Sequence, residues 1–123
     1  MNALLSSVLF VLCAMTALTE AGDFEATCTF IDVRLDLFAV TAECQDHNGD
    51  FGPNMEKNLD LCVGNVNGSL VPGTNFNQTC SNITNPDFLI IAADCITPSG
   101  TTMESSINLN DAITNVDGVL TCP

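Results

Sequence analysis

The chain has 123 residues, a formal net charge of −13 and neither tryptophan nor tyrosine. Its length predicts a single domain. The strong negative charge argues against binding to nucleic acid or to anionic membrane surfaces, whereas a neutral ligand or a basic partner is compatible with it. Without Trp or Tyr, a sugar site would have to depend on hydrogen bonds from Asn, Asp, Thr, Gln and backbone groups.

The first 21 residues are expected to be a signal peptide that is removed from the mature protein. Residues 3–18 are apolar apart from two serines and one threonine, and this run is too short to cross a bilayer as a helix. Small residues follow, so we expect cleavage after Ala21 or after Ala17. The alternatives are a short N-terminal membrane anchor and a buried helix. The signal-peptide interpretation predicts a secreted, extracellular protein whose domain is residues 22–123.

The mature chain is a tandem repeat. The segment Asn65–Leu70 returns as Asn115–Leu120, 50 positions later. A steady period over a whole chain predicts a duplicated fold with two related faces. We place the first repeat at residues 22–73 and the second at residues 74–123. The junction Val71-Pro72-Gly73-Thr74 is short, so the two halves should pack against each other.

The predicted elements are almost all short β-strands. Residues 35–44 alternate apolar side chains between two faces, and residues 88–93 form a continuous apolar run that is typical of a central, buried strand. Residues 109–113 are predicted to form one helical turn. No segment has the length or period of a long helix, so the pattern predicts an all-β domain with one or two helical turns.

Glycine and proline mark the predicted boundaries between these strands. Hairpin-type dipeptides and a further turn signal occur at Asn48-Gly49, Asn67-Gly68, Pro98-Ser99-Gly100 and Asp117-Gly118. The two remaining internal prolines, Pro53 and Pro86, are expected in loops.

Six of the seven cysteines follow residue 21, and an even number in a short secreted chain indicates a disulfide framework. Six cysteines allow 15 pairings, and the duplication selects among them. The equivalent spacing of Cys28–Cys44 and Cys80–Cys95 predicts one bridge within each repeat. By elimination, the third bridge is Cys62–Cys122.

The chain offers little for catalysis or metal binding. Its one histidine is His47, whereas a catalytic triad needs a nucleophile, a base and an orienting acid. Residues 46–50 begin like a calcium loop, but Phe51 stands where the loop needs glycine and Lys57 where it needs glutamate. No pair of acidic residues stands out as a glycosidase pair. We therefore expect no enzyme activity, no metal and no cofactor.

Three N-glycosylation sequons lie close together, at Asn67, Asn77 and Asn82. They are typical of a eukaryotic secreted glycoprotein. The equivalent stretches around Asn115 and Phe24 have none.

Each repeat begins with Phe-x-x-Thr-Cys, at residues 24–28 and 76–80, and a second cysteine follows about 15 residues later. Residues 107–118 also match the block Ile-x-Leu-(Asp/Asn)-x-x-(Ile/Val)-x-Asn-(Val/Ile)-Asp-Gly, with a looser copy at Leu59 to Gly68. This combination resembles the cyanovirin-N homology family of lectins, and the resemblance covers essentially all of residues 22–123.

The resemblance implies an elongated, pseudo-symmetric fold in which each half combines a three-stranded sheet with a β-hairpin exchanged between the repeats. It also implies non-catalytic binding of mannose-type oligosaccharides, or of glycoproteins that carry them. No membrane insertion is implied. Strand exchange is compatible with a monomer and with a domain-swapped dimer.

The resemblance further implies one carbohydrate site at each end of the molecule. The residues that it assigns to a primary site are Gly22, Asp23, Thr27, Gln45, His47, Asn115, Val116 and Asp117. Those that it assigns to a secondary site are Asn65, Asn67, Thr74, Asn75, Gln78, Thr79, Ile96 and Thr97. Taken alone, Asn115 and Asp117 would be explained as turn residues.

The two sites are not expected to be equal. Asn67 stands where the primary site has Asp117, and it heads a sequon. Ile96 and Pro98 stand where long polar side chains would help. We therefore expect the primary site to bind and the secondary site to be weakened or lost. The alternative is a disulfide-stapled structural or protein-interaction module that kept the fold and lost sugar recognition.

Overall fold

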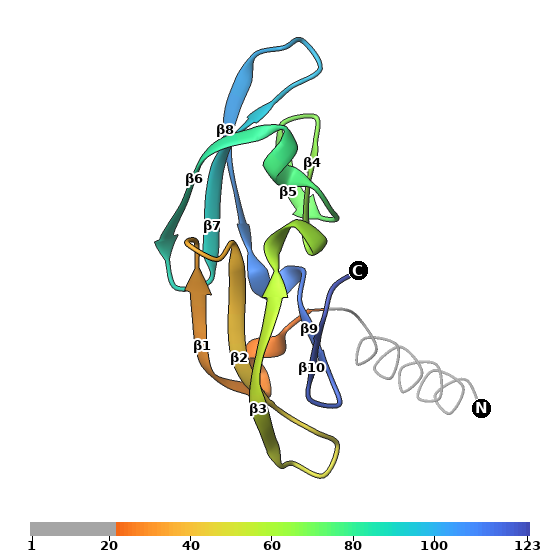
Figure 1. Ribbon diagram of the computed structural model, residues 1–123. Coiled ribbons are helices and arrows are strands. Elements are labelled where there is room, and N and C mark those ends of the chain that lie inside the picture. Colours follow the sequence, from red (N-terminus) through yellow and green to blue (C-terminus); the bar gives the residue numbers. More distant parts are fainter. Residues whose placement is uncertain (1–21) are drawn as a thin grey trace, which may run out of the picture.

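Short antiparallel strands build the whole of residues 22–123, the part of the chain that our computed structural model describes. The expected signal peptide lies outside the described residues. Within residues 22–123, no helix is long and apolar enough to cross a membrane. The strands form two lobes stacked along one long axis, which gives the elongated molecule seen in Figure 1.

Each lobe contains a three-stranded sheet and a two-stranded hairpin. The sheets have the orders β1-β2-β3 and β6-β7-β8, and the hairpins are β4-β5 and β9-β10. The strands of the first repeat are β1 (Cys28–Arg34), β2 (Ala39–Gln45), β3 (Phe51–Asn58), β4 (Val63–Val66) and β5 (Ser69–Pro72). Those of the second are β6 (Cys80–Asp87), β7 (Ile90–Ile96), β8 (Thr102–Asn108), β9 (Thr114–Val116) and β10 (Val119–Thr121).

The hairpins are exchanged between the repeats, as expected. Hairpin β4-β5 belongs to the first repeat but lies along β8 of the second, where the Leu70 N–H donates to Ser105 Oγ at 2.9 Å. Hairpin β9-β10 of the second repeat lies along β3 of the first. The lower lobe in Figure 1 therefore combines β1, β2 and β3 with β9 and β10, and the upper lobe holds the other five strands. The all-β, pseudo-symmetric fold class is confirmed.

Residues 22–123 contain four 3₁₀ turns, more than the one or two helical turns expected: η1 (Phe24–Ala26), η2 (Leu59–Leu61), η3 (Phe76–Gln78) and η4 (Leu109–Asp111). Each repeat has one at its start and one after its third strand. Turns of three residues are too short to leave a helical period in the sequence. Each nevertheless inserts one fully buried side chain into the core, and these are Phe24, Leu59, Phe76 and Leu109.

The alternating segment at residues 35–44 is a strand only from Ala39 onward. Residues 35–38 form the turn between β1 and β2, in which the Leu37 N–H donates to the Arg34 carbonyl at 3.2 Å. Phe38 adopts a left-handed φ of 54°. Its ring stacks on that of Phe76, with 5.2 Å between the ring centroids, so tertiary packing overrides the local alternation. Likewise β7, the expected central strand of its sheet, begins only at Ile90.

Pro53 and Pro86 lie within strands and not in loops, which corrects the expectation for both. Pro53 is in β3 and Pro86 is in β6, each an outer strand of its three-stranded sheet. An outer strand has ladder positions whose N–H groups face away from the neighbouring strand, so proline can occupy one without loss of a ladder hydrogen bond.

The three disulfides are Cys28–Cys44, Cys80–Cys95 and Cys62–Cys122, the pairs that the duplication predicts. The first two join residues that are directly opposite each other on neighbouring strands. The third spans 60 positions and joins the start of β4 in the upper lobe to the chain end after β10 in the lower lobe. It therefore crosses between the lobes.

Candidate functional site

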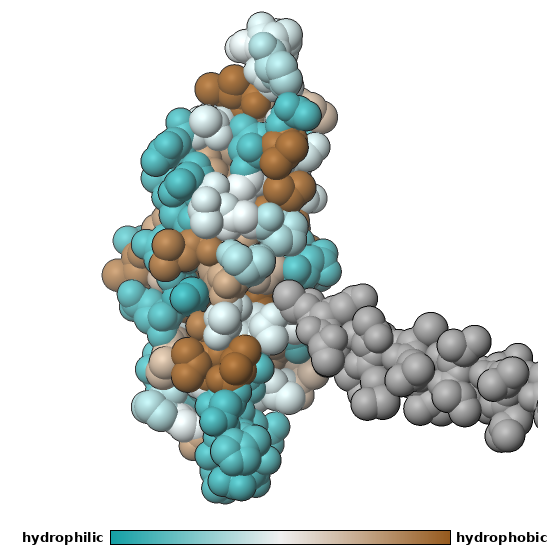
Figure 2. Space-filling view, turned by 90° about the vertical axis from the view of Figure 1, so that its right-hand side faces the viewer, coloured by the Kyte–Doolittle hydropathy of each residue, from teal (hydrophilic) through white to brown (hydrophobic). Residues whose placement is uncertain are grey.

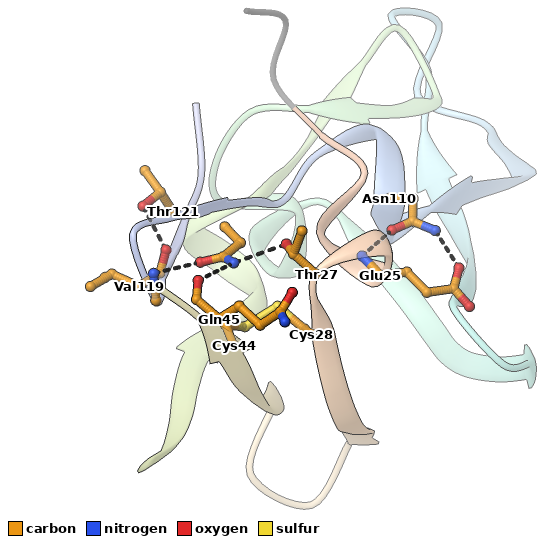
Figure 3. Close-up of a disulfide and its surroundings, with 10 residues drawn as sticks. Glu25, Thr27, Cys28, Cys44, Gln45, Asn110, Val119 and Thr121 are labelled. Atoms are coloured by element: carbon orange, nitrogen blue, oxygen red, sulfur yellow. Dashed lines mark hydrogen bonds between the residues drawn. A yellow bond between two sulfur atoms is a disulfide. The ribbon is translucent and has the colours of Figure 1, made fainter. Parts of the chain in front are cut away.

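The β9-β10 turn at the primary end is anchored by the side chain of Asn115. Its amide nitrogen donates to Thr27 Oγ1 at 2.9 Å and to the Gln45 carbonyl at 2.8 Å. Its carbonyl oxygen accepts from the Gly118 N–H at 2.8 Å, which closes the turn. One side chain therefore joins three segments that are far apart in the sequence, and Figure 3 shows Thr27 and Gln45 on either side of the Cys28–Cys44 disulfide.

His47 and Asp117 form an ion pair at the tip of this end. Asp117 Oδ1 accepts from the His47 N–H at 2.8 Å and lies 2.6 Å from His47 Nδ1. The hydrogen bond to Asp117 raises the pKa of His47, and the two bonds from His47 lower the pKa of Asp117. Both side chains are exposed, at 76% and 54%. Within residues 22–123 neither His47 Nε2 nor Asp117 Oδ2 makes a hydrogen bond, so these atoms are available to a ligand.

The loop that carries His47 is held by its own polar groups. Asp46 Oδ1 accepts from the N–H groups of Asn48 and Asp50, at 2.9 and 3.1 Å. Gln45 Nε2 donates to the Gly49 carbonyl at 3.1 Å. Residues 46–50, which begin like a calcium loop, thus form a self-closed turn. No group of three or more His, Cys, Asp or Glu side chains in the described part of the chain is arranged to hold a metal ion.

The chain start lies at the base of the same end. The Gly22 N–H donates to Thr114 Oγ1, next to Asn115, and the Asp23 N–H donates to the Asn110 carbonyl. Gly22 has a φ of +107°, and a Cβ there would collide with the Asn110 carbonyl. Gly22 and Asp23 are therefore fixed beside η4 and the start of β9.

Sequence reasoning missed the residue that fixes this start, Asn110. Its Oδ1 accepts from the Glu25 N–H at 3.1 Å, and its Nδ2 donates to Glu25 Oε1 at 2.7 Å (Figure 3). The available signal was the repeat itself, because Asp60 occupies the equivalent position and accepts from the Asn77 N–H at 3.0 Å.

The structure therefore gathers the eight predicted primary-site residues at one end of the molecule. Thr27, Gln45 and Asn115 are linked directly, and so are His47 and Asp117. Val116, the last residue of β9, is exposed and stands between Asn115 and Asp117 in the chain. In Figure 2 the extreme tip of this lobe, formed by the β2-β3 loop, is a hydrophilic surface.

The secondary end repeats the anchoring of the turn almost atom for atom. Asn65 Nδ2 donates to Thr79 Oγ1 at 3.0 Å and to the Ile96 carbonyl at 3.1 Å. The Gly68 N–H donates to Asn65 Oδ1 at 2.8 Å. Asn67 and Asp117 have the same left-handed backbone, with φ of 56° and 52°. The turn geometry at the two ends is thus conserved between the repeats.

The ionisable pair has no counterpart at the secondary end. The His47 position corresponds to Pro98, which has neither a backbone N–H nor a ring nitrogen that could bind Asn67. Within residues 22–123 the Asn67 side chain makes no hydrogen bond, and Thr97 Oγ1 bonds instead to Ser99 and Thr101 in its own loop. Polar groups that could contact a ligand are fewer here.

Side chains also crowd the secondary turn more closely. A Cβ placed on Gly68 would lie 2.8 Å from atoms of Met103 and Thr97, whereas one placed on Gly118 would meet nothing nearer than 3.6 Å. Thr74 and Asn75 lie at the start of the second repeat, where the Asn75 N–H donates to the Asp60 carbonyl at 2.8 Å. The Gln78 side chain is exposed on η3.

Comparison with known proteins gives a family and a set of similar structures. The family model described as the CVNH domain matches residues 24–121. The solved structure of GzCVNH from Gibberella zeae is 28% identical, with a TM-score of 0.65 and coverage of 80% of this chain and 95% of that one. TbCVNH from T. borchii is 26% identical, with a TM-score of 0.60 and coverage of 82% and 99%. Microvirin, solved as a mannobiose complex, is 27% identical, with a TM-score of 0.61 and coverage of 83% and 99%.

Proposed function

Because the chain belongs to the CVNH domain family, we propose that it is a secreted, non-catalytic lectin that binds mannose-type oligosaccharides at the primary end. The observation that carries this proposal is that the network of Asn115, Thr27 and Gln45, which is half-buried at Asn115 and Gln45, lies next in the chain to the exposed His47–Asp117 pair, at one end of the molecule. The similarity to microvirin, which was solved with mannobiose, supports the sugar class.

The proposed mode of binding uses hydrogen bonds and no covalent chemistry. Asp117 Oδ2 accepts from a sugar hydroxyl, and His47 Nε2 donates or accepts according to its protonation. Paired donors and acceptors of this kind match vicinal hydroxyl groups. The turn needs no rearrangement, because Asn115 already fixes it through three hydrogen bonds, so little ordering entropy is lost on binding.

The experiment is a glycan array and a mannan column with the mature protein in unglycosylated form. We expect retention on mannan and elution by free mannose. The double variant Asn115→Ala/Asp117→Ala should lose this binding, and the matched variant Asn65→Ala/Asn67→Ala should keep it. Undiminished binding by the first variant would refute the assignment of the site. Failure of the native protein on both the array and the column would instead favour a structural or protein-interaction module.

Secretion is tested separately with the full chain in eukaryotic cells. We expect the protein in the medium with an N-terminus at Gly22, or at Leu18 if cleavage follows Ala17. Retention in the membrane fraction with residues 1–21 intact would favour an N-terminal anchor.

A further inference from the structure

All three sequons lie in the upper lobe of Figure 1, away from the primary site. Asn67 is in the β4-β5 turn, Asn77 is in η3, and Asn82 is in β6. All three asparagines are exposed. In Figure 1 the β4-β5 hairpin lies in the upper lobe and the β9-β10 turn at the lower end. A glycan on this lobe is therefore directed away from the sugar-binding residues of its own chain.

The three sequons differ in whether the asparagine amide and the serine or threonine hydroxyl already form hydrogen bonds within the protein. Asn82 Nδ2 donates to Asp94 Oδ2 at 2.8 Å. In the Asn77 sequon, Thr79 Oγ1 accepts from Asn65 Nδ2 at 3.0 Å. Within residues 22–123, only the sequon Asn67-Gly68-Ser69 has both its amide and its hydroxyl free of hydrogen bonds. Its two reactive residues, Asn67 and Ser69, are exposed on either side of the buried Gly68, at the two-residue turn between β4 and β5.

Glycosylation of this sequon would add an oligosaccharide to the surface of the upper lobe. The Asn67 amide nitrogen forms a bond to the anomeric carbon of an oligosaccharide carried on a lipid pyrophosphate, the lipid pyrophosphate leaves, and the amide gives up one proton. The first sugar then stands on the rim of the secondary site beside Thr97 and Met103, which already crowd Gly68. A glycan of the high-mannose type has mannose as its outer sugars, which is the class proposed for the primary site.

We propose that the glycan on Asn67 of one copy is a ligand for the primary site of a second copy, so that the glycosylated protein associates with itself end to end. This inference rests on the proposed function. A site on one lobe and its ligand on the other make a head-to-tail contact, which builds a ring where the rotation between copies closes and an open series of oligomers where it does not. Direct contact between copies is disfavoured by their charge of −12 each, which is the chain total without Glu20. The glycan acts as a spacer between these acidic surfaces.

The test is sedimentation velocity with the full chain produced in cells that add high-mannose glycans, and intact mass gives the occupancy. We expect a weight-average mass that at least doubles with rising concentration, up to about 100 µM for a weak single site. Free mannose, or removal of the glycan by endoglycosidase, should return the weight-average mass to that of the monomer. Added salt should strengthen the association, because it screens the repulsion between copies.

Matched variants identify the glycan. Ser69→Ala destroys the sequon without altering Asn67 and should abolish the association, whereas Ser69→Thr keeps the sequon and should preserve it. Asn77→Gln and Thr84→Ala should have no effect. An unoccupied Asn67, or a monomer at every concentration while the unglycosylated protein still binds the mannan column, overturns this inference and leaves the proposed function intact. Failure of the unglycosylated protein on mannan overturns the proposed function itself.

Discussion

The two turns Asn65–Gly68 and Asn115–Gly118 share one design and differ in what surrounds it. In both, an asparagine side chain bonds to a threonine hydroxyl, to a backbone carbonyl and to the glycine N–H of the turn. Only the second turn has a carboxylate, Asp117, and a histidine from a neighbouring loop, His47, lies 2.6 Å from it. The comparison separates residues that build a turn from residues that can recognise a ligand.

The two ends also differ in the charge of the residue that precedes the turn glycine. The hydrogen bonds from the His47 backbone N–H and ring lower the pKa of Asp117, while Asn67 cannot ionise and Pro98 stands at the sequence position equivalent to His47. The neighbouring loops of both ends keep the same backbone bonds, since the Asp46 and Thr97 N–H groups donate to the Asp50 and Thr101 carbonyls at 2.9 and 2.8 Å. Divergence has therefore changed side chains on a preserved backbone frame.

The largest expected effect comes from replacing the two anchoring asparagines separately. Asn115→Ala and Asn65→Ala each remove three hydrogen bonds, so each should lower the free energy of unfolding by about 2 kcal/mol. Only Asn115→Ala should also abolish mannan binding. Thermal unfolding and calorimetric titration measure the two properties. Equal loss of binding in both variants would break the proposed division between the ends.

A smaller effect is expected from exchanging the acid between the ends. Asp117→Asn keeps the shape of the side chain but removes the charge that pairs with His47, and we expect sugar affinity about 10-fold lower. The reverse change, Asn67→Asp with Pro98→His, should raise the calorimetric stoichiometry from one ligand to two. Asn67→Asp alone is the control and should leave one, because Pro98 offers no donor. Two ligands bound by that single variant would show that Pro98 is not the limiting difference.

The smallest effect is a pH dependence confined to the primary end. His47 has a raised pKa, so its contribution to stability is present below the unfolded value near 6.5 and is lost as the pH rises through the folded pKa. Asp117 has a lowered pKa, so its contribution is present above the unfolded value near 3.9 and is lost as the pH falls through the folded pKa. The contributions of both groups are therefore complete between about pH 3.9 and about pH 6.5, their unfolded values.

NMR titration of the His47 ring measures this directly. We expect a midpoint above that of an unstructured histidine, and Asp117→Asn should bring it down. Asp46 also raises the His47 pKa, so Asp46→Asn is the control and should lower the midpoint less than Asp117→Asn does. A midpoint that Asp117→Asn leaves unchanged would show that the ion pair is not formed in solution.

The sequence predicted the long-range features of the fold better than the local ones. The period linked Asn65 to Asn115, and the spacing of the cysteines led to the bridges that the structure contains. The repeat period and the cysteine spacing can be found in the sequence because each depends only on which residue stands at a fixed position. The helical turn predicted at residues 109–113 is confirmed as η4. The number of such turns, the start of β2 and the places of Pro53 and Pro86 were predicted wrongly, since they depend on packing and on which strand lies at a sheet edge.

The candidate site was predictable as a set of residues and not as a set of contacts. His47 and Asp117 are 70 positions apart, and nothing in their local sequence pairs them. The same is true of Asn110 and Glu25, which are 85 apart. Such contacts follow from the hairpin exchange, which brings the end of the second repeat beside the sheet of the first.

Because of the Cys62–Cys122 bridge, proteolytic cleavage has different consequences in the β2-β3 loop and in the β7-β8 loop. A cut at Gly100, between β7 and β8, releases a C-terminal piece that still carries Cys122 and so stays covalently attached to the rest through Cys62. A cut at Gly49, between β2 and β3, leaves both cysteines of every bridge on the same side of the break. Only noncovalent packing then holds the fragments together. The loop beside the proposed sugar site is thus the one where a single nick can divide the molecule.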